Sequence, residues 1–202
     1  MKLYYSPGAC SLSPHIVLCE TGLDFTIEKV NLRTKETESG RDFSAINPKG
    51  YVPALELDGG EVLTEGPAIV QYVADLAPEK KLIPPAGTLA RARVQEWLNF
   101  IGTELHKNFT PLFNPASTDD IRNAAQANIA RRLPIAATAL DAHPYLIGDS
   151  FSVADAYLFT VLSWTGFVKV DIAPWPSLAA FVERMKARPG VQAALAAEGL
   201  DR

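Results

Sequence analysis

The chain has 202 residues, of which 48% are hydrophobic and 21% are charged, a balance typical of a globular protein with a buried core. Its formal net charge is -4, so no overall positive field favours nucleic acid or an anionic membrane. No apolar run approaches the roughly 20 residues that span a bilayer, and the first residues lack the apolar stretch of a signal peptide. We therefore expect a cytoplasmic protein with neither a nucleic-acid nor a membrane partner.

The first 80 residues alternate strand patterns with helix patterns. Alternating or β-prone runs predict strands, and apolar residues spaced three and four apart predict helices. A strand–helix–strand order at the start predicts a parallel pair joined by a crossover helix, and Gly59-Gly60 predicts a hairpin. In chain order we expect a strand at 2–5, a helix at 11–21, a strand at 25–31, a short helix after the polar stretch 34–40, strands at 54–58 and 62–64, and a helix at 67–76.

Beyond a proline-rich linker the strand signals largely stop. We expect residues 1–80 to form an α/β domain, 81–86 the linker and 87–202 an all-helical domain. The expected helices of the second domain cover 88–109, 119–142, 153–168, 177–188 and 191–197. Within it, Ser152 and Asp155 have the spacing of a capping box, so Asp155 is interpreted as a folding determinant and not as a catalytic acid.

Two cysteines are present, and each is expected to stay a free thiol. If Cys10 and Cys19 lie on one helix they are roughly 13 Å apart, whereas a disulfide needs Cα atoms within about 7 Å. Cys10 stands at a loop-to-helix junction, where unpaired N–H groups and the helix dipole stabilise a thiolate. The alternative is a small buried apolar residue, which we favour for Cys19. Because Ser13 replaces a second cysteine, chemistry at Cys10 would use a single thiol.

Two further groups of polar residues are candidates for a binding site. Asn99, Thr103 and His106 share one face of a predicted helix, with His106 able to donate a hydrogen bond or to act as an acid or base; a plain solvated face is the alternative. Glu65 and the helix start that follows it could hold the ammonium and carboxylate of an amino acid, or could simply begin a helix. Neither the cysteines nor His15 have zinc-site spacing, so we expect no metal.

At these residues the chain resembles the bacterial glutathione S-transferases of the beta class, over essentially all of its length. Any one of the matching motifs is weak, but five in order across the domain boundary are specific. They are Tyr4-Tyr5-Ser6-Pro7-Gly8-Ala9-Cys10-Ser11-Leu12, Asn47-Pro48-Lys49-Gly50-Tyr51-Val52-Pro53-Ala54-Leu55, Leu63-Thr64-Glu65-Gly66-Pro67-Ala68-Ile69, Glu104-Leu105-His106-Lys107 and Ser152-Val153-Ala154-Asp155-Ala156-Tyr157.

The resemblance implies a thioredoxin-like domain followed by an α-helical domain, in a homodimer. It further implies a cis peptide bond before Pro53 that exposes the Val52 backbone to glutathione, with Cys10 facing the sulfur. The remaining implied contacts are Glu65 and Gly66 at the γ-glutamyl end, Lys35 at the glycyl carboxylate, His106 and Lys107 near the sulfur, and Asn99, Thr103 and Glu104 completing the pocket. Gly66 departs from the family pattern, in which many members carry serine, so a hydroxyl contact is lost.

The function implied is conjugation of the glutathione thiolate to small hydrophobic electrophiles, with glutathione as co-substrate and with Cys10 and His106 as the catalytic candidates. The helical domain would supply the co-substrate pocket and part of the dimer interface. Two alternatives stay open. One is a glutathione-dependent thiol–disulfide reductase or peroxidase that uses Cys10 covalently, and the other is a non-catalytic protein that binds hydrophobic ligands.

Overall fold

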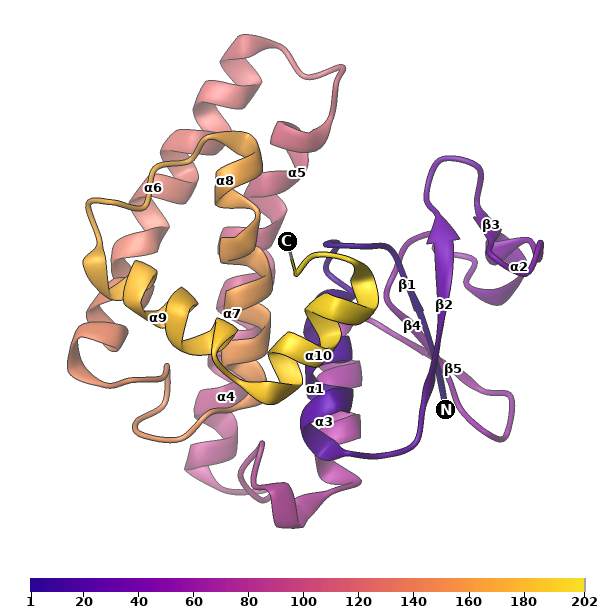
Figure 1. Cartoon of the computed structure of the whole chain (residues 1–202). Coiled ribbons are helices and arrows are strands. Elements are labelled where there is room, and N and C mark those ends of the chain that lie inside the picture. The colour runs from indigo at the N-terminus through magenta and orange to yellow at the C-terminus, as the bar shows by residue number, and fades with distance from the viewer. Residues whose placement is uncertain (202) are drawn as a thin grey trace. The chain divides into compact units, whose positions relative to one another are not determined.

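The computed structural model describes residues 1–201 and divides into two compact units (Figure 1). The N-terminal unit comprises Met1–Ile83 and Ala187–Arg202, and the helical unit comprises Pro84–Lys186. The C-terminal helix α10 (Pro189–Glu198) thus groups with the first unit, although the sequence pattern placed everything after residue 87 in the second. Gly190 is one physical reason: a Cβ there would lie 2.6 Å from Cγ of Glu20 in helix α1 (Leu12–Thr21), so a larger residue would force the Glu20 side chain to move away from α10.

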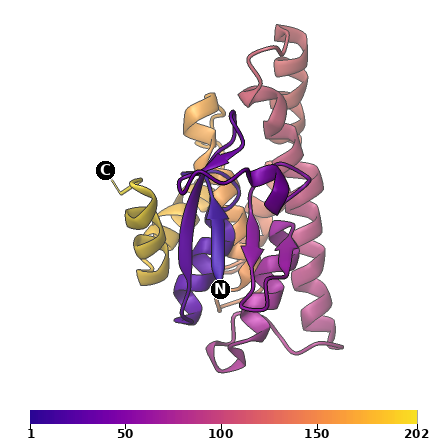
Figure 2. The same cartoon turned by 90° about the vertical axis from the view of Figure 1, so that its right-hand side faces the viewer.

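The N-terminal unit is a five-stranded sheet of order β3-β2-β1-β4-β5. β1 is parallel to β2 and antiparallel to β4, and β4–β5 is a hairpin, as predicted. Helices α1 and α3 pack together on one face of the sheet, away from the short helix α2 (Figures 1 and 2). The bounds are β1 Lys2–Tyr5, α1 Leu12–Thr21, β2 Thr26–Asn31, β3 Glu36–Thr37, α2 Phe43–Ile46, β4 Ala54–Glu56, β5 Val62–Thr64, α3 Gly66–Asp75 and the 3-10 turn η1 Pro78–Lys80.

The strand β3 was not predicted. It lies in the polar stretch 34–40 and pairs with the end of β2, with Val30 opposite Thr37. A two-residue edge strand is too short for an alternating apolar pattern, and its pairing partner is decided by the turn that precedes it.

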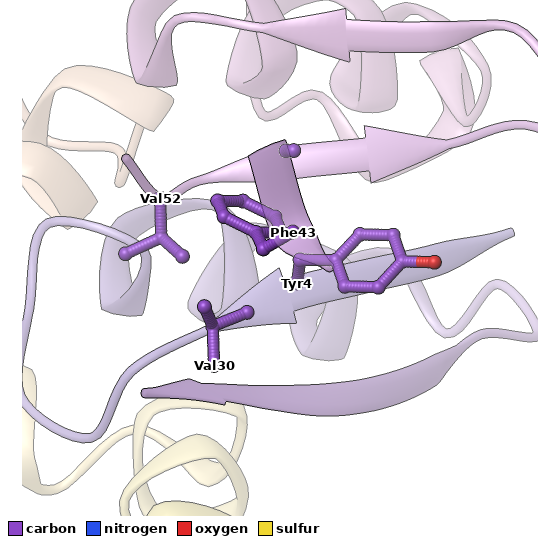
Figure 3. Packing of buried hydrophobic residues seen from close by; sticks show 5 residues of the cluster. Tyr4, Val30, Phe43 and Val52 are labelled. Carbon is purple, nitrogen blue, oxygen red and sulfur yellow. The ribbon is translucent and has the colours of Figure 1, made fainter. Parts of the chain in front are cut away.

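The core on the α2 side of the sheet holds the segment before β4 in place. Tyr4, Val30, Phe43, Val52 and Ala54 are buried and pack together (Figure 3). They come from β1, β2, α2, the start of β4 and the segment just before β4, so this one cluster joins most of the sheet. Burying the Val52 side chain here leaves its backbone at a defined position beside Cys10.

The helical unit contains no strand among the elements that the structure describes within residues 84–186. Its elements are α4 Leu89–Phe100, the π-helix η2 Ile101–His106, α5 Lys107–Phe113, α6 Asp119–Ala142, α7 Val153–Ser163, α8 Thr165–Val168 and α9 Pro176–Lys186. The fold class predicted from the sequence, a thioredoxin-like domain plus an all-helical domain, is confirmed. Within residues 1–201, no helix combines the length and apolarity needed to cross a membrane.

The start of α7 has the capping box that the sequence predicted. The Asp155 carboxylate accepts hydrogen bonds from the amide and hydroxyl of Ser152, each at 2.8 Å, and from the Leu146 amide at 2.9 Å. Burial of this side chain raises the pKa of Asp155 to about 6, against the opposing effect of these hydrogen bonds. Asp155 therefore serves as a structural residue, because its acceptor capacity is used to organise the helix start.

Candidate functional site in two parts

Cys10 lies in the turn between β1 and α1, two residues before the first residue of α1. Its side chain is half-buried and its Sγ donates to the backbone carbonyl of Val52 at 3.2 Å. Both cysteines are free thiols, as expected. Burial, followed by the charge of Glu20, raises the pKa of the Cys19 thiol to about 11, so Cys19 stays protonated at neutral pH.

A residue from the far end of the chain holds the Cys10 turn. The buried carboxylate of Glu198 accepts from the Gly8 amide and bonds to Nδ1 of His15, each at 2.8 Å. His15 is thereby a structural residue, and Glu198 is a partner that the sequence did not identify. Because Glu198 is 190 residues from Gly8, no local pattern could have shown the pairing.

The Val52–Pro53 peptide bond is cis, which confirms the expectation that followed from the resemblance. The carbonyl of Tyr51, next to it, accepts from the Asn47 side chain at 2.7 Å. Lys35, expected to bind a carboxylate, adopts a left-handed backbone conformation with φ 60° and its Nζ donates to the Gly50 carbonyl at 2.6 Å. Lys35 and Val52 therefore belong to one connected patch of backbone and side-chain groups.

Glu65 and Gly66 stand where β5 gives way to α3. Glu65 is exposed, has φ 69° and precedes the first residue of α3. Its Oε1 accepts from Nζ of Lys49 at 2.7 Å and from the Tyr51 hydroxyl at 2.8 Å. The hydrogen bond to Glu65 raises the pKa of Lys49, so this ammonium stays charged at neutral pH. Lys49 and Tyr51 were not proposed as site residues, although both stand in a motif that carried the resemblance.

The N-terminal patch has the groups that an extended peptide needs. Val52 presents backbone amide and carbonyl groups, Cys10 lies beside that carbonyl, and the start of α3 places the Gly66 amide next to the Glu65 carboxylate. A Cβ on Gly66 would meet Pro53 Cγ at 3.8 Å, an ordinary contact, so the space there would accept a serine.

Four residues of the helical unit that were expected to bind glutathione are either hydrogen-bonded within that unit or exposed. The Asn99 side chain donates to the Gln95 carbonyl and the Thr103 hydroxyl to the Asn99 carbonyl, and both residues are exposed. Glu104 is paired with Nε of Arg132 at 2.7 Å. Lys107, at the start of α5, is exposed.

His106 differs from these neighbours because its ring is packed among aromatic side chains. Its Nδ1 is 2.7 Å from the Tyr157 hydroxyl, and its ring centre is 4.8 Å from that of Trp164. Burial, followed by the charge of Lys107, lowers the pKa of His106 to about 4, so the imidazole is neutral at pH 7. The predicted shared face with Asn99 and Thr103 was based on a regular helix. The π-helical turn η2 changes the spacing along that face, and His106 points into the aromatic cluster.

A cavity of about 460 Å³ also opens on the helical unit. Two strongly exposed aromatic rings, Phe113 and Phe167, contribute to its wall. The complete lining is Leu112, Phe113, Arg122, Gln126, Phe167, Val168 and Lys169. It offers apolar surface with two cations at its margin. No cluster of three or more potential metal ligands occurs within the part of the chain that the structure describes.

Two family models match the chain, the N-terminal domain of glutathione S-transferase over residues 8–76 and its C-terminal domain over residues 100–189. Glutathione S-transferase GstA of Escherichia coli O157:H7 is 50% identical over 200 residues, covering 99% of this chain and 100% of the relative.

Solved structures agree with this. The ternary complex of BphK, a bacterial glutathione S-transferase, is 58% identical with a TM-score of 0.98, covering 99% of this chain and 100% of that one. A sphingomonad glutathione S-transferase solved with glutathione is 48% identical, and a beta-class enzyme from Sphingomonas chungbukensis is 49% identical. Both have a TM-score of 0.96, and each match covers 99% of this chain and 100% of the other. The chain therefore belongs to the glutathione S-transferase family, as an enzyme of the beta class.

Proposed function

We propose that this protein binds glutathione on the patch around Cys10 and Val52 and conjugates its thiolate to small hydrophobic electrophiles. The observation that carries the proposal is the 3.2 Å contact between Cys10 Sγ and the Val52 carbonyl. A cysteinyl unit that pairs with the Val52 backbone brings its own sulfur to the same turn. The family membership and the glutathione held by a sphingomonad relative support this choice of thiol.

The two ends of glutathione have different partners in this proposal. Glu65 takes the γ-glutamyl ammonium while the Gly66 amide takes its carboxylate, because this amide donor stands next to the Glu65 carboxylate at the start of α3. Lys35 takes the glycyl carboxylate by exchanging its bond to the Gly50 carbonyl for a charged acceptor, which makes a stronger hydrogen bond. Pro53 and Cys10 are the remaining residues of the N-terminal unit that we assign to glutathione binding.

The helical unit contributes the remaining groups. His106 acts as a hydrogen-bond donor to the sulfur, and Lys107 adds positive charge that favours a thiolate. Asn99, Thr103 and Glu104 stay assigned to the pocket by the resemblance alone. The exposed rings of Phe113 and Phe167 offer apolar surface for the electrophile. In the reaction the glutathione sulfur forms a bond to carbon as a halide leaves or an epoxide opens.

A conjugation assay tests this function. Purified protein is given glutathione and a chlorinated nitroaromatic compound, and formation of the thioether with release of chloride is measured. Cys10→Ala is compared with Cys19→Ala as the matched control, since Cys19 is a thiol on the same unit that stays protonated. If Cys10→Ala still conjugates glutathione but no longer reduces a mixed disulfide, Cys10 is required for the reductase activity and not for conjugation. Binding of glutathione without turnover of any electrophile would instead favour a ligand-binding protein.

We also infer a homodimer located in the cytoplasm. Two free thiols, one of them half-exposed at the site, suit a reducing compartment. Light scattering of the eluting protein should give about twice the chain mass of 21.9 kDa, and a mass near 21.9 kDa at micromolar concentration would contradict the dimer. The functional division into residues 1–80, a linker at 81–86 and residues 87–202 is part of the same proposal.

A further inference from the structure

One ring nitrogen of His106, Nδ1, is hydrogen-bonded to the side chain of Tyr157. The hydroxyl of Tyr157 lies 2.7 Å from Nδ1, and the two rings are edge-to-face with centres 5.9 Å apart. Trp164 covers another side of the imidazole, again edge-on. The histidine ring is therefore held in orientation by two aromatic side chains and by one hydrogen bond.

Tyr157 is itself well anchored. It lies in α7, which packs against α4 and η2 (Figure 1), and its side chain is 4% exposed. Gly102, one turn before His106, faces it without a side chain: a Cβ there would lie 3.6 Å from the Tyr157 hydroxyl. The capping box of Ser152 and Asp155 sets the start of the same helix. The phenol oxygen consequently has little freedom to move away from His106.

The protonation states decide which partner donates. A neutral imidazole carries one N–H and one lone pair. A phenol is a stronger acid than a neutral imidazole N–H, and an imidazole nitrogen is a stronger base than a phenol oxygen. The stronger of the two possible hydrogen bonds is therefore from the Tyr157 hydroxyl to Nδ1 of His106, which leaves the proton on Nε2.

We infer that Tyr157 is a positioning residue that keeps His106 in the tautomer with its proton on Nε2, so that the imidazole offers a donor to the glutathione sulfur. This inference rests on the role of His106 in the proposed function. In the opposite tautomer Nε2 would carry a lone pair and could not donate a hydrogen bond to a thiolate. A donor fixed before the substrate arrives costs no reorganisation when negative charge is on the sulfur.

The test compares wild type with Tyr157→Phe, which keeps the ring that packs on His106 and removes the hydroxyl. Tyr145→Phe is the matched control, because Tyr145 is a tyrosine of the same unit whose ring packs on Phe151. Long-range ¹H–¹⁵N spectra of ¹⁵N-histidine protein at pH 7 report the tautomer without any substrate. We expect a protonated Nε2 and a hydrogen-bonded, unprotonated Nδ1 in wild type and in Tyr145→Phe, and a mixture of tautomers in Tyr157→Phe.

The kinetic readout is a split between two parameters. Tyr157→Phe should lower kcat for conjugation about tenfold, while KM for glutathione changes less than about twofold, because the lost interaction acts on the charged sulfur and not on the peptide. Wild-type spectra with the proton on Nδ1, or a Tyr157→Phe spectrum identical to that of wild type, would overturn the inference.

A second measurement covers the case in which Tyr157→Phe does not fold. In wild-type protein produced with 3-fluorotyrosine, the phenol of Tyr157 is more acidic and donates a stronger hydrogen bond. The ¹⁵N signal of His106 Nδ1 should therefore shift. An unchanged signal contradicts the inference. The two possible failures are distinguishable. Wild type that turns over no electrophile overturns the proposed function, whereas active wild type with unchanged spectra in both altered proteins overturns the role of Tyr157.

Discussion

The candidate site residues of the N-terminal unit and those of the helical unit have contrasting surroundings. In the N-terminal unit the groups are backbone atoms and exposed charges, with Cys10 on the Val52 carbonyl and Glu65 on Lys49 and Tyr51. In the helical unit His106 is neutral and packed between Tyr157 and Trp164. The first arrangement suits a charged peptide whose ends stay near water. The second suits a group that must act beside a reactive atom in one protonation state.

In each unit, one buried carboxylate supports the candidate site residues. Glu198 holds the Cys10 turn, and Asp155 organises the helix that carries Tyr157. These supports are where the largest effects of substitution are expected, because a buried polar group that loses its partner stays buried. The exposed contacts of the N-terminal patch should matter less for stability and more for affinity.

Glu198→Ala should have the largest effect, lowering the free energy of unfolding by about 3 to 5 kcal/mol. It leaves both the Gly8 amide and Nδ1 of His15 without their buried acceptor. Urea unfolding followed by far-ultraviolet circular dichroism measures the change. Glu198→Gln, which keeps an acceptor of the same shape, should lose clearly less; equal losses for both variants would mean that the hydrogen bonds are not the cause.

Because His106 is neutral in the folded protein, the free energy of unfolding should depend on pH. The change should be similar in size to the effect of Glu198→Ala. Its pKa is about 4 in the folded protein, below the value of about 6.5 in an unfolded chain, so the unfolded state binds the proton first. The stability that comes from this difference is present above pH 6.5 and is lost as the pH falls through 4, a loss of about 3 kcal/mol. Wild type should therefore lose more stability than His106→Asn between pH 8 and pH 4. Parallel pH profiles would contradict the burial of the ring.

Asp155→Ala should cost about 2 kcal/mol, since it removes a capping interaction and leaves the Leu146 and Ser152 amides without their acceptor. All three tryptophans, Trp97, Trp164 and Trp175, lie in the helical unit, so tryptophan fluorescence during urea unfolding follows this unit. Ser152→Ala, which keeps both amide contacts to Asp155, is expected to lose less. A loss equal to that of Asp155→Ala would assign the effect to the serine hydroxyl.

Glu65→Ala should have the smallest effect on folding and a clear effect on binding. Glu65 is exposed, so we expect little change in the unfolding midpoint, but the dissociation constant for glutathione should rise about tenfold as a charged hydrogen bond is lost. Titration calorimetry compares Glu65→Ala with wild type and with the control Glu61→Ala, which changes a glutamate in the neighbouring hairpin. Unchanged affinity in Glu65→Ala would break the assignment of this patch to the γ-glutamyl end.

Much of the fold could be predicted from local pattern. The strands around Gly59-Gly60, the helix ending at Gly22 and the capping box of Ser152 and Asp155 depend on neighbours in the chain, and the structure has all three. The same holds for Cys10, whose position before α1 follows from the turn that precedes it. Local pattern failed at β3, which is too short to show a period, and at η2, where a π-helical turn interrupts a regular helix.

The sequence by itself determined the family, the order of the elements other than β3 and η2, and the residue types at the candidate site, because each depends on motifs of a few adjacent residues. Tertiary structure alone decided which partner each residue received: Glu198 for the Cys10 turn, Tyr157 for His106 and Lys49 for Glu65. It also assigned α10 to the N-terminal unit through the close approach at Gly190. The physical reason is common to these cases. A hydrogen bond or a packing contact depends on distance in space, and residues far apart in the chain carry no mutual periodicity that a pattern could detect.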